Sequence, residues 1–288
     1  MVSAVLLHRL VSEAAAIVID PMRLSAPLPD CRAVDLVPSG MKREAHLMPL
    51  CVRPCDLDAS GREALVGWIE AVVCHRDDPP ALLIVDAAES TERVLSHLRR
   101  RLIIRLADGQ QCIFRYFDPM VLKHLEWMLD TSQRAALLGP GTSWCYWLDG
   151  QWRRLNQVTP SASTDFQVDA LLSARLGRVA ALNGVVATQS GVTTAATRIE
   201  LYREIDSYIA RAQAKRLPRE QDWEAFARLC LSCHPRFDEN PLVIELFGQA
   251  LDDESEFKDL AYAEGEEFWA SVSSDMALEN ANCRSATT

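Results

Sequence analysis

Cysteine and histidine occur at residues 230–234, C-L-S-C-H, with the spacing used for covalent attachment of haem c. Such attachment requires export, and the first residues form no signal peptide, because they lack a basic cluster and His8 interrupts the apolar run. A zinc site needs two further ligands, and a proline separates the other close pair, Cys51 and Cys55. We therefore predict that residues 230–234 hold neither haem nor metal, and that the chain has no cofactor.

Two aspartates, Asp20 and Asp86, each end a short apolar run. Because ligands of α/β enzymes bind at the carboxyl edge of the sheet, such a carboxylate can hold a divalent metal; it can equally cap the next turn. The D-x-D pattern of aspartate-nucleophile phosphatases, G-x-S-x-G and phosphate-binding glycine loops are all absent from the sequence. We expect that the chain is not an enzyme, and keep a metal-dependent α/β enzyme using Asp20 or Asp86 as the alternative.

The first half of the sequence alternates between strand and helix patterns. The runs Ala15 to Asp20 and Ala81 to Asp86 are continuously apolar, which predicts central strands covered on both faces of a sheet. Between them, Ser60 and Glu63 have the spacing of a capping box and predict the start of a helix. This pattern predicts an α/β lobe in which helices cover a mixed sheet.

Two dipeptides predict hairpins in the same lobe. Asp108-Gly109 lies between apolar runs, and a two-residue turn there would put Ile104 on the same face as Ile113. Asp149-Gly150 separates the aromatic stretch Ser143 to Leu148 from the segment Trp152 to Leu155 and predicts the last hairpin of the lobe.

The second half of the sequence is helical in character. Residues 157–165 are rich in Thr, Ser and Pro and predict a linker, whereas residues 166–197 have no firm assignment. From Arg198 onward, helix patterns follow one another, with starts at Pro218 and at Asn240-Pro241. The predicted fold class is α+β: an N-terminal α/β lobe over residues 1–156, a linker and undetermined segment over 157–197, and a smaller all-helical lobe over 198–288.

Composition and net charge indicate which kinds of partner the chain does not bind. The hydrophobic content of 49% and charged content of 24% are typical of a folded globular protein. The formal net charge of -10 argues against nucleic acid as a partner, and Arg99, Arg100 and Arg101 are better explained as cations at a helix end. No apolar run is long enough to span a membrane, so we expect a cytoplasmic protein whose nine cysteines are structural.

The segment Phe114 to Pro140 has the most specific order of features. It contains Phe-Arg-Tyr-Phe at the end of a strand, Asp-Pro at the start of a helix, and a short helix that begins Thr-Ser-Gln and is closed by Gly-Pro. A Trp- and Tyr-rich strand follows. In this order the chain resembles the chaperone (adaptor) family of bacterial type VI secretion, well over about Ala15 to Leu155 and only in outline beyond. The residues that carry the motif are Phe114, Arg115, Tyr116, Phe117, Asp118 and Pro119.

The resemblance implies a cytoplasmic protein that is not an enzyme. Its partners would be a specific toxic effector, which it binds, and the VgrG spike, onto which it helps to load that effector. The motif itself has two interpretations: Asp118 and Pro119 start a helix and Arg115 is paired inside the lobe, or the motif contacts the partner directly. The family commonly has a basic residue where Met120 stands, so any partner contact made by that residue is absent here. The sequence does not identify the effector or the surface that binds it.

Overall fold

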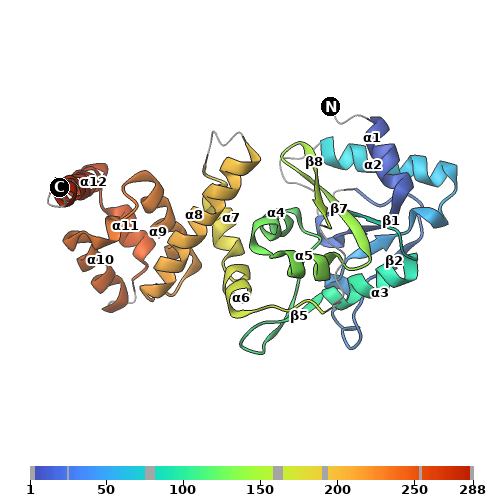
Figure 1. The fold of residues 1–288 in the computed structure, drawn as a ribbon, viewed down its shortest axis with the longest axis horizontal. Coiled ribbons are helices and arrows are strands. Elements are labelled where there is room, and N and C mark those ends of the chain that lie inside the picture. The colour runs from blue at the N-terminus through green and yellow to red at the C-terminus, as the bar shows by residue number, and fades with distance from the viewer. Residues whose placement is uncertain are drawn as a thin grey trace. The chain divides into compact units, whose positions relative to one another are not determined.

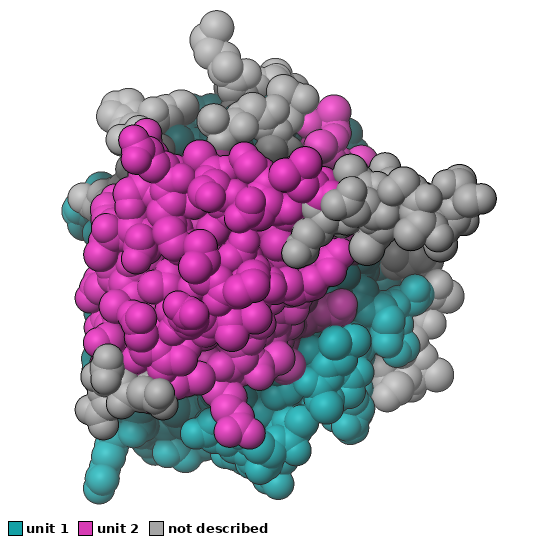
Figure 2. All heavy atoms as spheres, turned by 90° about the vertical axis from the view of Figure 1, so that its left-hand side faces the viewer, with its two compact units in different colours: residues 1–173 teal, residues 174–288 magenta. Residues whose placement is uncertain are grey.

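The computed structural model describes residues 4–24, 26–74, 82–157, 165–189, 194–252 and 255–285. The chain forms two compact units, residues 1–173 and 174–288, which are coloured separately in Figure 2. The first combines a sheet with helices, and the second is helical throughout its described residues, so the predicted α+β class is confirmed. No helix in the described part of the chain is long and apolar enough to cross a membrane.

The first unit is built around a six-stranded sheet in the order β2-β3-β1-β4-β7-β8. Figure 1 labels β1, β2, β7 and β8 of this sheet. The strands are β1 (Ala14–Ile19), β2 (Ala33–Asp35), β3 (Leu50–Val52), β4 (Leu82–Ala87), β7 (Gly141–Leu148) and β8 (Gln151–Asn156). The two apolar runs form β1 and β4 in the middle of the sheet, as predicted; Ala81, at the start of the second run, lies outside the described residues. Every strand pair is antiparallel, so the predicted mixed sheet is wrong.

Helices cover both faces of this sheet, and successive side chains of the central strands point to opposite faces. Ile17 and Ile19 of β1 pack with the apolar side chains of α1 (Ala4–Glu13) and α2 (Ala59–Cys74). The other face lies under α3 (Thr91–Arg101), α4 (Pro119–Met128) and α5 (Thr131–Leu138). Coverage of both faces explains why the strands are continuously apolar.

One predicted helix start and one predicted turn differ from the structure, the first by two residues and the second by one. Helix α2 begins at Ala59, and Asp58 rather than Ser60 accepts the amide of Gly61, at 2.7 Å. The strands β5 (Ile103–Arg105) and β6 (Gln111–Ile113) form a separate two-stranded sheet.

The turn of the β5–β6 hairpin contains three residues instead of two. Leu106 donates its amide to the carbonyl of Gln110, so residues 107–109 form the loop, with Gly109 at φ 87°. Ile103 rather than Ile104 therefore lies opposite Ile113. The β7–β8 hairpin has the predicted two-residue turn at Asp149-Gly150, and both residues have the positive φ of a type I′ turn.

The second unit contains the helices from α7 onward, while α6 (Ala170–Leu176) spans the boundary between the units. Its helices are α7 (Val179–Val186), α8 (Ala195–Ala214), α9 (Glu220–Ser232), α10 (Pro241–Asp252), α11 (Phe257–Ala263) and α12 (Glu266–Ser285). Asn240 accepts the amide of Leu242 at 3.0 Å, which explains the predicted helix start at Asn240-Pro241. The core contains stacked phenylalanines, such as Phe247 on Phe257, whose ring centroids are 4.8 Å apart.

The first unit extends beyond residue 156 because later residues pack on it. Phe166 stacks on Phe114 with ring centroids 5.8 Å apart. Gln133 of α5 donates to the Asp169 carboxylate at 3.4 Å. Residues 165–173 thus belong to the first unit, and most of the predicted Thr-, Ser- and Pro-rich linker, residues 158–164, lies outside the described residues.

Candidate functional site

Two Asp-Pro-Met triplets, at residues 20–22 and 118–120, have the same local structure. Oδ1 of Asp20 accepts the amide of Met22 at 2.9 Å and caps the 3₁₀ helix η1 (Pro21–Arg23). Oδ1 of Asp118 accepts the amide of Met120, also at 2.9 Å, and caps α4. Proline suits the position after each cap because the missing amide has no helical partner to lose. Both aspartates are buried, with 1% and 6% exposed.

Arg115 joins the two triplets into one cluster. Its Nη2 donates to Oδ2 of Asp20 at 2.7 Å and to Oδ2 of Asp118 at 3.2 Å. Nη1 of Arg23 lies 3.5 Å from Oδ1 of Asp118 and adds a second cation. Burial lowers the pKa of the Arg115 guanidinium, but the hydrogen bond and charge of Asp20, followed by those of Asp118, outweigh it and raise that pKa above its usual value. The cluster of Asp20, Arg23, Arg115 and Asp118 thus balances two buried carboxylates with two arginines.

The aromatic residues of the predicted motif face the core. Tyr116 and Phe117 are fully buried, and Phe114 is 4% exposed. The Tyr116 hydroxyl donates to the carbonyl of Leu98 at 3.1 Å, and burial raises its pKa well above the usual value. Its ring lies 5.1 Å from that of Trp144 on β7. These contacts anchor the segment between β6 and α4 to the sheet.

The structure brings the six predicted site residues together, mostly as part of the scaffold. Pro119 is buried at the first turn of α4, and Asp118 caps that helix as predicted. Arg115 is the exception, because 37% of its side chain is exposed, above a Phe117 ring whose centroid is 5.3 Å from its Cζ. The pairing of Asp20 with Arg115 was not predicted, although the repeated Asp-Pro-Met could have linked Asp20 to Asp118.

Asp86 is the other carboxylate at a strand end. It lies at the opposite end of the central strands from Asp20. Strands β1 and β4 are antiparallel, and Asp86 pairs with Ala14, at the far end of β1 from Asp20. The two aspartates therefore cannot share one ligand, as carboxylates at the same edge of a parallel sheet could. Among the described residues, no group of three or more His, Cys, Asp or Glu side chains is arranged to hold a metal ion.

The residues with haem-like spacing lie at the end of α9 and have other contacts. Burial raises the pKa of the Cys230 thiol to about 12, and burial also raises the pKa of Cys233. The Cys233 thiol donates to the carbonyl of Trp269 at 3.3 Å, and Nδ1 of His234 accepts the Arg236 amide at 3.1 Å. The Cys233 thiol and the His234 ring thus make contacts within the second unit.

The first unit is thus an antiparallel α+β unit in which paired aspartates and arginines join the end of β1 to the start of α4. Residues 42–136, about a third of the chain, match the model of a family described as Domain of unknown function (DUF4123). This match lies within the part of the sequence that resembles the type VI secretion chaperones and includes Arg115 and Asp118. No curated protein and no solved structure matches the chain.

Proposed function

We propose that this protein is an effector adaptor of type VI secretion, which binds one toxic effector in the cytoplasm and helps to load it onto the VgrG spike. The observation that carries the proposal is the match of residues 42–136 to DUF4123, a family associated with such adaptors. On this proposal the protein acts by binding and does not catalyse a reaction. The pairing of buried Asp20 with Arg115 favours it over a metal-dependent enzyme that uses Asp20.

The inward orientation of the motif is consistent with this function. Tyr116, Phe117 and Asp118 make contacts within the first unit, so they stabilise a scaffold that presents other residues to a partner. A motif of this kind can be shared among proteins that bind different effectors, because the surface that recognises each effector lies elsewhere.

Exposed apolar side chains in the second unit also support a protein-binding role. Leu242, Ile244 and Leu251 of α10 are 46–52% exposed, and Tyr262 at the end of α11 is 89% exposed. Tyr262 and Trp269 line a groove of about 1350 Å³ formed by α9, α11 and α12. Leu242, Ile244 and Leu251 do not line this groove, but exposed apolar side chains and aromatic side chains in a groove are both typical of surfaces that bind another protein.

Co-expression with the effector encoded beside this gene tests the proposal. We expect the two proteins to elute together from a size-exclusion column and the soluble yield of the effector to rise. Because apolar and backbone contacts carry most of the expected interface, high salt should weaken the complex only modestly. The control is co-expression with an unrelated soluble protein, which should elute separately. Separate elution of the effector at low and at high salt, with unchanged solubility, would contradict the adaptor function.

A further inference from the structure

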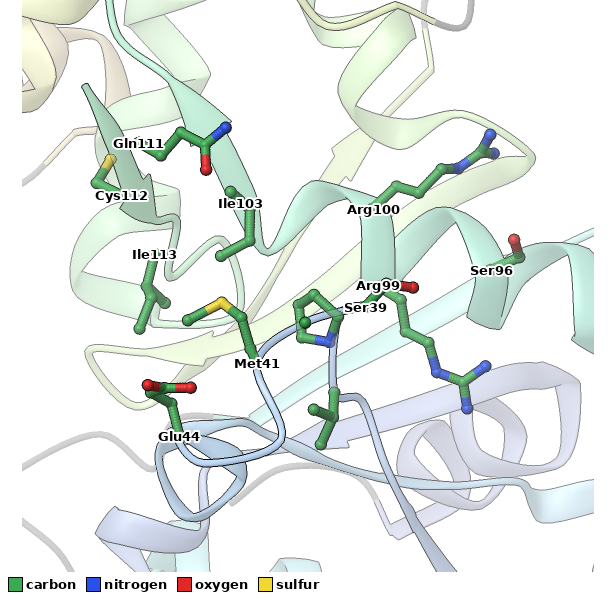
Figure 3. Close-up of a pocket in the computed structure, with 13 residues that line it drawn as sticks. Ser39, Met41, Glu44, Ser96, Arg99, Arg100, Ile103, Gln111, Cys112 and Ile113 are labelled. Atoms are coloured by element: carbon green, nitrogen blue, oxygen red, sulfur yellow. The ribbon is translucent and has the colours of Figure 1, made fainter. Parts of the chain in front are cut away.

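A pocket of about 730 Å³ lies in the first unit, and Asp20, Arg115 and Asp118 are not among its lining residues (Figure 3). The last turns of α3, the loop over residues 37–44 and the β5–β6 hairpin form its walls. All of these segments belong to the first unit.

The charged residues that line the pocket are Arg99, Arg100 and Glu44. The side chains of Arg99 and Arg100 form no hydrogen bond or ion pair with any residue that the structure describes, and both reach solvent. The neighbouring Arg101 differs, because its Nε donates to the carbonyl of Ala136 at 3.3 Å and its Cζ lies 5.8 Å from the ring centroid of Phe166. In Figure 3, Arg99 and Arg100 lie at the opposite end of the pocket from Glu44. Their side chains extend in different directions from the end of α3, so each guanidinium group can bind a separate carboxylate.

The pocket also has an apolar wall. Ile103 and Ile113 lie opposite each other in the β5–β6 hairpin, and Met41 faces them from the loop (Figure 3). All three are only partly buried. An aliphatic side chain placed between them would remove apolar surface from water, which is favourable by about 25 cal/mol per Å². This wall suits a protein segment better than a free anion.

The outer edge of β6 offers backbone hydrogen bonds beside the same wall. Phe114 donates to Leu102 and Leu106 donates to Gln110, both at 2.8 Å. Hydrogen-bonded and non-bonded pairs alternate in an antiparallel ladder. Gln111 and Ile113 are in the non-bonded pairs, so their amide and carbonyl groups point away from β5. No described strand pairs with that edge of β6. An extended segment can therefore add to β6 as a further strand.

We propose that this pocket binds an extended segment of the effector that combines acidic and aliphatic side chains. Its carboxylates pair with Arg99 and Arg100, an aliphatic side chain packs against Ile103, Ile113 and Met41, and its backbone pairs with β6. Glu44, at the other end of the pocket, repels acidic residues. The segment therefore binds with its acidic residues toward α3. This inference rests on the proposed function, since it assigns the effector as occupant.

The first experiment reverses the charge of the pocket in the co-expressed complex. We expect Arg99→Glu/Arg100→Glu to reduce the effector in the complex peak at least tenfold, while circular dichroism stays unchanged and the melting temperature falls by no more than about 4 °C, because carboxylates are unfavourable at a helix C-terminus. Arg32→Glu is the matched control, because Arg32 is exposed, does not line the pocket, and has no hydrogen bond or ion pair within the described part of the chain. A double variant that retains the wild-type amount of effector overturns the assignment and leaves the adaptor function intact.

A second experiment tests the pocket without the effector. A fluorescent peptide of alternating glutamate and valine should bind the wild-type protein in an anisotropy titration and fail to bind Arg99→Glu/Arg100→Glu, whereas a peptide of alternating lysine and valine should not bind. If the effector itself does not co-elute, the proposed function fails and this titration alone decides the role of the pocket. Calorimetric binding of inorganic phosphate without binding of the acidic peptide would instead identify a small-anion site and overturn the proposal.

Discussion

Arg115 and the pair Arg99 and Arg100 lie in the same unit but in opposite electrostatic surroundings. Arg115 donates to two buried carboxylates, which hold it in one place. Arg99 and Arg100 line a pocket and have no carboxylate partner among the described residues. The difference indicates that the motif around Arg115 stabilises the fold, whereas the arginines at the end of α3 are available to a partner.

Substitutions at these two sites should affect different properties: stability at the cluster and partner binding at the pocket. A substitution in the cluster removes the partner of a buried charge, and that loss lowers the free energy of unfolding. A substitution at the pocket removes charges that are already hydrated, so it changes stability little and changes partner binding more. Measuring both quantities on each variant therefore tests the two roles independently.

The largest expected effect on stability is that of Arg115→Met. It leaves Asp20 buried without its arginine, and breaking a buried pair costs about 3–5 kcal/mol. Because 37% of the Arg115 side chain is exposed, we expect the low end, about 3 kcal/mol, in urea denaturation. Adding Asp20→Asn should recover part of the loss, since it removes one of the uncompensated charges. A loss below about 1 kcal/mol for the single variant would mean that the cluster contributes no more than an exposed ion pair.

A smaller effect is expected for Asp118→Ala, which removes the cap of α4 and the second carboxylate of Arg115. Loss of an N-cap costs about 0.5–2 kcal/mol, and we expect about 2 kcal/mol because the pairing with Arg115 is lost as well. Asp118→Asn keeps an oxygen that can accept the Met120 amide, so its loss should be smaller. The folded variants should still bind the effector, because Asp118 is buried. Loss of the complex with an unchanged melting temperature would instead identify Asp118 as a direct contact.

The hairpins show which parts of the fold local sequence could predict. At Asp149-Gly150 two residues with positive φ join β7 and β8, and the dipeptide alone predicted that turn correctly. At Asp108-Gly109 the glycine has positive φ, but Ala107 also belongs to the loop and the register shifts by one residue. A turn dipeptide indicates a reversal of the chain, whereas the number of loop residues depends on which amide and carbonyl pair across the strands.

Strand direction in the sheet and the pairing within the cluster depend on contacts between residues that are distant in the sequence, so local patterns did not predict them. Continuous apolar runs predicted that β1 and β4 are buried, but burial on both faces does not fix strand direction, and the pairs are antiparallel. The sequence predicted Asp118 as a cap and allowed Asp20 to be one, yet their shared pairing with Arg115 follows only once β1 and the start of α4 lie together. Arg99 and Arg100 looked like ordinary helix-end cations, because their lack of a partner is visible only in three dimensions.

The smallest expected effect on stability is that of Arg99→Met/Arg100→Met, and it completes the comparison with Arg115. Both residues lie in the last turn of α3, where a cation stabilises the helix dipole by about 0.3–1 kcal/mol at low ionic strength. Three adjacent arginines repel one another, which offsets part of that gain, and Arg101 remains in the variant. We therefore expect a loss of about 0.5 kcal/mol in urea denaturation at low salt, and less at physiological salt because both side chains are hydrated. Methionine keeps the apolar stem of arginine, so the fold of α3 should be preserved while the guanidinium groups proposed to pair with the effector's carboxylates are lost. A destabilisation as large as that of Arg115→Met would show that these arginines are paired within the fold, and the contrast between the two sites would no longer hold.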